Sequence, residues 1–175
     1  ASMSMELLAH PYLEECYDED AANRARRTHL ENLVRVLSWI ATIDAFQHWI
    51  YTHPDHTREQ RDIYWLELDG IYGSNVSWEG FDDQRAKQWH RQLHLFGVPF
   101  YYIEYGIAQL GALQLWLQYR EDPGRAIANY RRAMTLGGSR PLPQLFEAAE
   151  IEFNFGPETM ERLISEVDSE LQALP

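Results

Sequence analysis

The sequence has a single cysteine and a single lysine, and both shortages limit what the protein can be. Cys16 has no second cysteine to pair with, so an internal disulfide framework is excluded and the chain fits a reducing compartment. Lys87 is the only lysine, and the arginines are scattered, so the basic stripe of a nucleic-acid-binding protein is missing. The 27 acidic residues outnumber the 15 basic ones and give a net charge of −12, which opposes binding to nucleic acid or anionic membranes. We expect neutral or cationic partners.

A long uninterrupted hydrophobic run is also missing. The most apolar window, from Val98 to Leu117, contains Glu104, Gln109 and Gln114, which argues against a bilayer span. The first residues do not show the charged region, apolar region and cleavage site of a secretory signal peptide. These features predict a cytoplasmic protein without a membrane partner.

The sequence predicts an all-α fold, because no segment alternates apolar and polar residues with the period of a strand. The hydrophobic content of 45% and the length of 175 residues favour one folded unit, which we take as a single helical segment over 1–175. Apolar residues between Leu30 and Ile50 recur at spacings of three and four and predict one long helix. Turn and cap residues delimit the expected helices, which cover about 14–51, 82–95, 99–119, 124–136, 142–149 and 157–174. A further helix runs to about Tyr72, with Asp55 or Thr57 as its cap.

Two pairs of side chains at helical spacing invite a metal-site interpretation. His90 and His94 are four residues apart, but Arg91 stands where a zinc peptidase of the His-Glu-x-x-His type carries its catalytic glutamate. We therefore expect one solvated and one inward-facing histidine on a helix. Asp44 and His48 also lie four apart, and a hydrogen bond within the long helix is the simpler interpretation.

Small residues and a tyrosine between Ala126 and Met134 resemble part of a tetratricopeptide-type helical hairpin. Such a repeat needs a second copy about 34 residues away. No second copy is present in the sequence, so a repeat adaptor is not favoured.

The most unusual feature is a group of polar aromatic residues beside an apolar helix, namely His94, Tyr101, Tyr102 and Tyr105. A helix built only for packing would use Leu or Ile there, because a buried phenol without a hydrogen-bond partner costs about 1–3 kcal/mol. Two interpretations stay open. The residues form either a buried aromatic seam or a set of hydrogen-bond donors aimed at the carbonyl oxygen of an amide under attack.

Four blocks of the sequence resemble, in order, the C-terminal region of oligoendopeptidase F-type zinc metallopeptidases, which are relatives of thimet oligopeptidase. The resemblance runs nearly from end to end. The blocks are SMSMELLAHPYLEE, IDAFQHWIYTHPDHTREQRDIYW, HLFGVPFYYIEYGIAQLGALQLW and RAMTLGGSRPLPQLFEAAEIEF.

The resemblance implies a multi-helix C-terminal segment of a zincin-type catalytic lobe, incomplete as a lobe, from an enzyme that cuts short peptides. Zinc in such enzymes is held by a His-Glu-x-x-His helix and a further glutamate, and these ligands are not present in this chain. We therefore expect the chain to be inactive alone and to work with the missing N-terminal part of the peptidase. Its exposed apolar surface then makes self-association possible.

The resemblance also implies roles for the aromatic group. His94, Tyr102 and Tyr105 match the residues that stabilise the oxyanion, and His94, Tyr101 and Tyr102 are candidates for binding the substrate. The alternative is a non-catalytic helical module that binds peptides or a protein partner.

Overall fold

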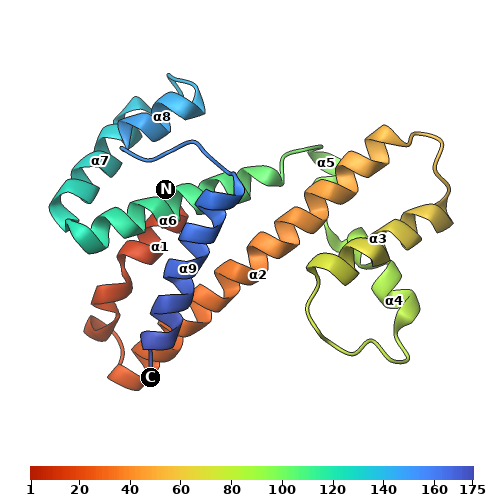
Figure 1. Ribbon diagram of the computed structural model, residues 1–175, viewed down its shortest axis with the longest axis horizontal. Coiled ribbons are helices and arrows are strands. Elements are labelled where there is room, and N and C mark those ends of the chain that lie inside the picture. Colours follow the sequence, from red (N-terminus) through yellow and green to blue (C-terminus); the bar gives the residue numbers. More distant parts are fainter. The chain divides into compact units, whose positions relative to one another are not determined.

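The computed structural model describes all residues, 1–175, and its regular secondary structure is entirely helical, which confirms the all-α prediction (Figure 1). Nine α-helices are joined by turns, loops and two short 3-10 helices, η1 and η2. Their bounds are α1 Ser2–Leu8, η1 His10–Glu15, α2 Glu19–Thr52, α3 Arg58–Tyr72, α4 Asp82–Ala86, η2 Gln88–Arg91, α5 His94–Gly97, α6 Ile103–Glu121, α7 Pro123–Leu136, α8 Leu142–Ala148 and α9 Pro157–Ala173. None of these helices is long and apolar enough to cross a membrane.

The chain divides into two compact units. The first unit contains Ala1–Leu33 and Ile107–Pro175, and the second contains Val34–Gly106. The expectation of one helical segment over 1–175 stays a prediction, and each unit is described by itself below.

Several helix ends follow the cap residues in the sequence. The Thr57 hydroxyl accepts a hydrogen bond from the Gln60 backbone, and the Thr57 backbone N–H donates to the Gln60 side-chain oxygen, so a capping box starts α3. The Asp122 side chain caps α7, with Pro123 in its first turn, and Gly137 ends that helix at a φ of +53°. These starts and this end agree with the predicted boundaries.

Three predicted boundaries differ from the structure. The long helix begins at Glu19 rather than near residue 14, because Asp18 accepts a hydrogen bond from the Ala21 backbone and starts the helix there. The helix predicted over 82–95 is instead the three short elements α4, η2 and α5. Helix α6 begins at Ile103, because Phe100 has a φ of +59°, which a right-handed helix does not accommodate.

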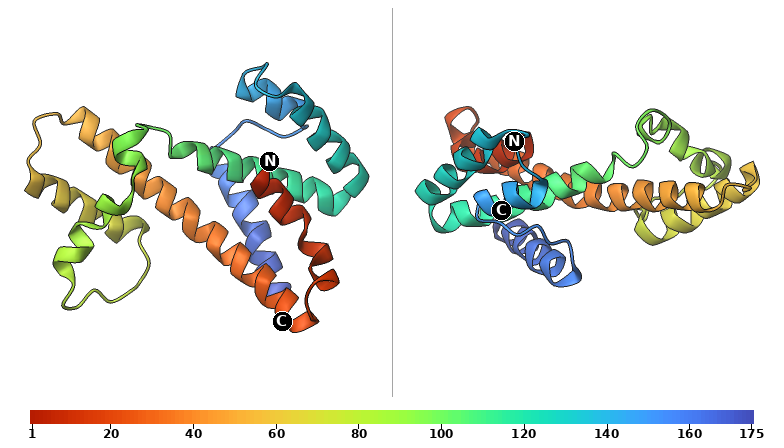
Figure 2. Two further views of the ribbon diagram at one scale, coloured as in Figure 1. Left: turned by 180° about the vertical axis from the view of Figure 1, so that it is seen from behind. Right: turned by 90° about the horizontal axis from the view of Figure 1, so that it is seen from above.

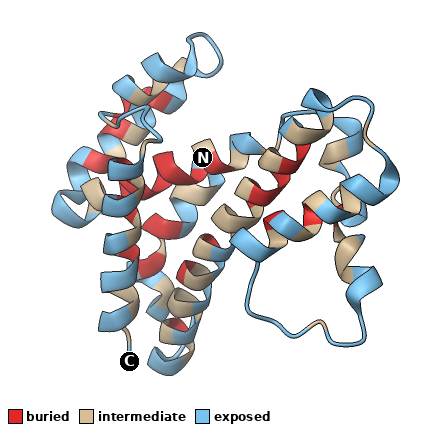
Figure 3. Cartoon of the chain, turned by 45° about the vertical axis from the view of Figure 1, so that its right-hand side comes forward, coloured by how far each residue is buried: buried red, intermediate tan, exposed pale blue.

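The second unit has an aromatic core. Phe46 from α2 and Trp65 from α3 are fully buried and meet edge to face, with ring centroids 5.2 Å apart. Trp89 of η2 packs against Phe46 at 5.5 Å, which ties the short helical elements to α2. The loop 73–81 that connects α3 and α4 is almost entirely exposed (Figure 3).

In the first unit, helices α7 and α8 lie side by side (Figures 1 and 2). Leu8, Leu115 and Ala126 form a small buried cluster that joins α1, α6 and α7. Two glutamines of α6 also hold the segment after α8, since the buried Gln114 amide donates to the Glu152 carbonyl at 2.9 Å and accepts from the Glu152 backbone at 2.8 Å. Gln118 donates to the Glu150 carbonyl at 2.5 Å, which fixes the neighbouring turn.

Candidate functional site

The four aromatic side chains singled out in the sequence lie together in the second unit. The His94 ring lies 4.9 Å from the ring of Tyr102 and 5.6 Å from that of Tyr105, measured between centroids. The Tyr101 ring is 6.3 Å from His94 and 5.8 Å from Tyr105. We call His94, Tyr101, Tyr102 and Tyr105 the aromatic cluster.

The cluster combines α5, the first turn of α6 and the turn between them. His94 begins α5, and Tyr105 lies in the first turn of α6. Tyr101 and Tyr102 precede α6, so they are not on the helix that the sequence predicted for them. A tight turn rather than helical spacing therefore brings the tyrosines to the histidine.

The turn before the tyrosines is fixed by a buried side chain of α2. Phe100 has a positive φ, and its backbone N–H donates to the Gln47 side-chain oxygen at 2.8 Å. Gln47 is only 2% exposed, so the bond is protected from water. The Phe100 ring lies 4.9 Å from each of the rings of His48 and Tyr51, measured between centroids, which adds packing to the turn.

The rings of the cluster are not sealed inside the packed helices. Tyr101 is 49% exposed, and His94, Tyr102 and Tyr105 are half-buried. A half-buried phenol or imidazole is held in place by its neighbours while its edge stays within reach of a ligand. These exposures do not fit the buried aromatic seam, which was one of the two interpretations of the sequence.

Tyr102 has the most perturbed electrostatics of the group. Burial raises the pKa of its phenol, and the neighbouring Trp39 indole opposes that rise. A raised pKa keeps the hydroxyl proton in place at neutral pH. Tyr102 therefore remains a hydrogen-bond donor under ordinary conditions.

Two residues that the sequence did not single out contact the cluster. The Trp39 indole donates to the Gln92 side-chain oxygen at 3.0 Å, and the Gln92 amide lies 2.6 Å from His94 Nδ1. Trp39 and Gln92 are 53 residues apart, so no local pattern connects them.

The competing histidine pairs have other arrangements. His90 is exposed in η2 and meets the ring of Trp89, whereas His94 lies in α5, so the two do not share a helix. Asp44 Oδ2 and His48 Nε2 lie 3.5 Å apart on α2, so the two side chains face each other within the helix, at ion-pair distance when the imidazole is protonated. No group of three or more His, Cys, Asp or Glu side chains in the chain is placed to hold a metal ion.

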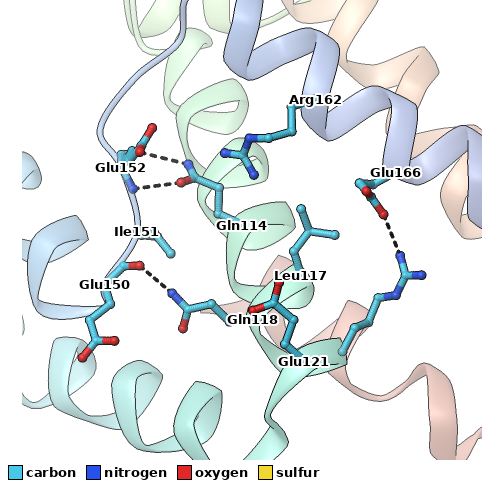
Figure 4. Close-up of a pocket in the computed structure, with 10 residues that line it drawn as sticks. Gln114, Leu117, Gln118, Glu121, Glu150, Ile151, Glu152, Arg162 and Glu166 are labelled. Atoms are coloured by element: carbon cyan, nitrogen blue, oxygen red, sulfur yellow. Dashed lines mark hydrogen bonds and ion pairs between the residues drawn. The ribbon is translucent and has the colours of Figure 1, made fainter.

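A separate cavity lies in the first unit (Figure 4). It has a volume of about 670 Å³, and Gln114 and Gln118 point toward its wall at Glu150 to Glu152. Two of its lining residues, Arg120 and Glu166, form an ion pair, with Nη1 and Oε2 3.3 Å apart. Its lining is mostly charged, and none of the four residues of the aromatic cluster reaches it.

Comparison with solved structures gives three extensive similarities. An oligoendopeptidase F is 31% identical with a TM-score of 0.85, and the match covers 98% of this chain and 30% of that one. PZ peptidase A, solved with an inhibitor, is 28% identical with a TM-score of 0.89 and coverages of 98% and 31%. An oligoendopeptidase F from Bacillus anthracis is 27% identical with a TM-score of 0.75 and coverages of 98% and 27%. The chain thus spans less than a third of each of these proteins.

Comparison with curated proteins finds no match. The family model of peptidase family M3 matches residues 1–163, which is most of the sequence and includes the whole aromatic cluster. Together with the shared fold, this match shows that the chain belongs to peptidase family M3.

Proposed function

We propose that this chain is the part of a zinc-dependent oligopeptidase that binds short peptides and stabilises the oxyanion formed when the peptide bond is attacked. The observation that supports this most directly is the convergence of one imidazole and three phenols in a half-open cluster. His94 Nε2 lies 3.2 Å from the Tyr105 hydroxyl, and the Tyr102 ring lies 5.2 Å from the Tyr105 ring. Family membership supplies the substrate class, since the relatives are peptidases.

Hydrogen-bond donors are effective in hydrolysis of an amide because negative charge develops on the carbonyl oxygen. Each donor already aimed at that oxygen lowers the barrier by about 3–4 kcal/mol, because it need not reorient during the reaction. The phenols of Tyr102 and Tyr105 are the proposed donors to the oxyanion. The more exposed Tyr101 is proposed to hold the peptide backbone. His94, whose two ring nitrogens face Gln92 and Tyr105, is proposed to orient the Tyr105 hydroxyl.

The zinc chemistry of such a peptidase belongs, in this proposal, to a portion joined to this chain. The described side chains do not fit a zinc site, since no three potential ligands are gathered. Within this segment the proposed chemistry is therefore hydrogen bonding to the substrate. The net charge of −12 favours peptides with free amino termini or basic residues. We further propose a cytoplasmic location, which the single cysteine favours.

The test is Tyr105→Phe in the complete enzyme, in which this chain is joined to the portion that carries the metal ligands. The substitution removes one hydroxyl and preserves the ring contacts with His94 and Tyr102. We expect kcat to fall by about 100-fold with little change in KM, because the donor is used mainly in the transition state. Turnover of a quenched fluorogenic peptide measures both constants.

Tyr72→Phe is the matched control. Tyr72 lies in α3 of the same unit, is 41% exposed and makes no side-chain hydrogen bond in the structure. Its substitution should leave both constants unchanged. An unaltered kcat in Tyr105→Phe would remove Tyr105 from the reaction, and a raised KM alone would assign the cluster to peptide binding without catalysis.

A further inference from the structure

Three hydrogen bonds connect the core of the second unit to the Tyr105 hydroxyl. The Trp39 indole Nε1 lies 3.0 Å from Gln92 Oε1, and Gln92 Nε2 lies 2.6 Å from His94 Nδ1. His94 Nε2 in turn lies 3.2 Å from the Tyr105 oxygen. No other hydrogen-bond partner of the Tyr105 hydroxyl is present in the structure.

The Trp39 indole, the first donor of the chain, sets the direction of all three hydrogen bonds. An indole N–H can only donate, so the Gln92 atom that faces Trp39 must be the amide oxygen. The other end of the amide is then NH₂, which can only donate, so His94 Nδ1 must be an unprotonated acceptor. A neutral imidazole with a free Nδ1 carries its hydrogen on Nε2. His94 therefore donates to the Tyr105 oxygen.

The direction of the last bond decides where the Tyr105 proton lies. If His94 carried its hydrogen on Nδ1, its Nε2 would accept, and the Tyr105 proton would point to the imidazole. With the hydrogen on Nε2, the Tyr105 oxygen accepts from His94, and its own proton is left for another acceptor. A phenol oxygen that accepts one hydrogen bond is also a better donor in its own O–H bond, since chained hydrogen bonds polarise one another.

We propose that Gln92, oriented by Trp39, is a positioning residue that fixes the tautomer of His94 and thereby frees the Tyr105 proton for the oxygen of the substrate. The proposal rests on the proposed function for the identity of that acceptor. The tautomer itself is a property of the free protein.

The local fold supports a fixed orientation for both residues. Trp39 packs edge to face on the buried Trp65, with ring centroids 5.6 Å apart, and the Arg91 guanidinium lies 4.7 Å from the centre of the Trp39 ring. Gln92 lies between η2 and α5 with φ −88° and ψ 88°, so the helical path is interrupted at this residue. The interruption places the side chain of Gln92 between the indole and the imidazole.

The direct test is the protonation state of the His94 ring nitrogens, read from nitrogen-15 NMR of the histidine-labelled protein. His94→Gln identifies the resonances among the seven histidines. We expect hydrogen on Nε2 and a bare Nδ1 in the unaltered protein. Gln92→Glu presents a carboxylate that can only accept, so the hydrogen should then be found on Nδ1. Gln92→Met, with neither donor nor acceptor, should give a mixture of both tautomers.

Activity of the complete enzyme provides the second readout. Gln92→Glu should lower kcat by about tenfold, because the Tyr105 proton is then directed to His94, while KM changes little. Gln84→Glu is the control, because it introduces the same charge at an exposed position in α4 of the same unit, away from the cluster. If Gln92→Glu fails to fold, Gln92→Met carries the same test with a smaller loss of kcat.

The two proposals fail in different ways. Hydrogen on Nδ1 in the unaltered protein, or an unchanged tautomer in Gln92→Glu, would overturn the role of Gln92 even if Tyr105→Phe is inactive. An unchanged kcat in Tyr105→Phe would overturn the proposed function. The tautomer of His94 would still test the hydrogen-bond chain in that case.

Discussion

Phe100 is the residue whose backbone conformation matters most to the aromatic cluster. A φ of +59° in a residue other than glycine costs about 1–2 kcal/mol, and here it directly precedes Tyr101 and Tyr102. The buried acceptor on Gln47 compensates by binding the Phe100 N–H at 2.8 Å. Strain beside a candidate site is common, because the surroundings must hold a conformation that the residue would not choose alone.

Gln47→Leu tests this arrangement. The substitution leaves the Phe100 N–H without its partner and removes a polar group that is 2% exposed, so we expect a loss of about 1–3 kcal/mol in the free energy of unfolding. Urea unfolding measures the loss, with Gln84→Leu as a control at an exposed position of the same unit. Stability unchanged from the control would show that Gln47 does not hold the turn.

For single residues, the sequence predicted which side chains form the aromatic cluster but not which residues hold them in place. His94 and the three tyrosines fall within twelve positions, so their residue types alone indicated a possible cluster, and the structure brings them together. Trp39 and Gln92 are separated by 53 residues, as are Gln47 and Phe100. Contacts at such separations depend on tertiary packing, which no spacing rule encodes.

Among the elements, α6 shows how far periodicity alone can predict. The apolar pattern predicted a helix over 99–119, and the structure has it at Ile103–Glu121. The start was wrong because the positive φ of Phe100 cannot be recognised from residue type. Gln114, which argued against a membrane span, binds the backbone at Glu152, and Gln118 one turn later binds the backbone at Glu150.

Gly111 in the middle of α6 is explained by close packing within the first unit. A Cβ atom there would lie 2.9 Å from Cζ and 3.2 Å from Cε1 of Phe146. Alanine would favour the helix by about 1 kcal/mol, but displacing the Phe146 ring costs about 1–3 kcal/mol. Phe146 also packs against Phe153 at 5.1 Å, so it cannot move without disturbing a second ring.

We therefore expect Gly111→Ala to lower the free energy of unfolding by about 1 kcal/mol. The matched measurement is a double-mutant cycle with Phe146→Leu, whose shorter side chain leaves room for the methyl group. In that background the alanine should be neutral or stabilising, because only its helix preference remains. An equal loss in both backgrounds would mean that Phe146 is not the obstacle.

For the whole molecule, the family and the candidate site rest on different observations. The match over residues 1–163 gives the family, and the cluster in the second unit gives candidate residues within it. Self-association through exposed apolar side chains stays a prediction. Leu93, Ile71 and Val76 each have more than half of their surface exposed, which is the kind of surface that such association would cover.

Stability of the folded chain should depend on pH through a buried histidine pair in the first unit. His10 is 8% exposed, and its Nε2 lies 2.7 Å from Nδ1 of His29. Burial lowers the pKa of His10 from 6.5 to about 4, and the nearby charges of His29 and Arg26 add to the effect. The folded state therefore keeps His10 neutral at a pH where the unfolded chain binds a proton. Its contribution to stability is complete above pH 6.5 and is lost as the pH falls toward 4.

We expect urea unfolding to show a falling stability between pH 7.5 and pH 5, by about 1–3 kcal/mol from this group. The window avoids Glu150, whose pKa is lowered from 4.5 to about 2 chiefly by hydrogen bonds from Arg125 and Arg132, so that its contribution is lost only in more acidic solution. His10→Gln is the matched variant, because the amide can still donate to His29 but does not titrate. The net charge of −12 acts in the opposite direction, since acid reduces self-repulsion, and it does so equally in both proteins. The difference between the two curves isolates His10, and parallel curves would contradict its assignment as a buried neutral histidine.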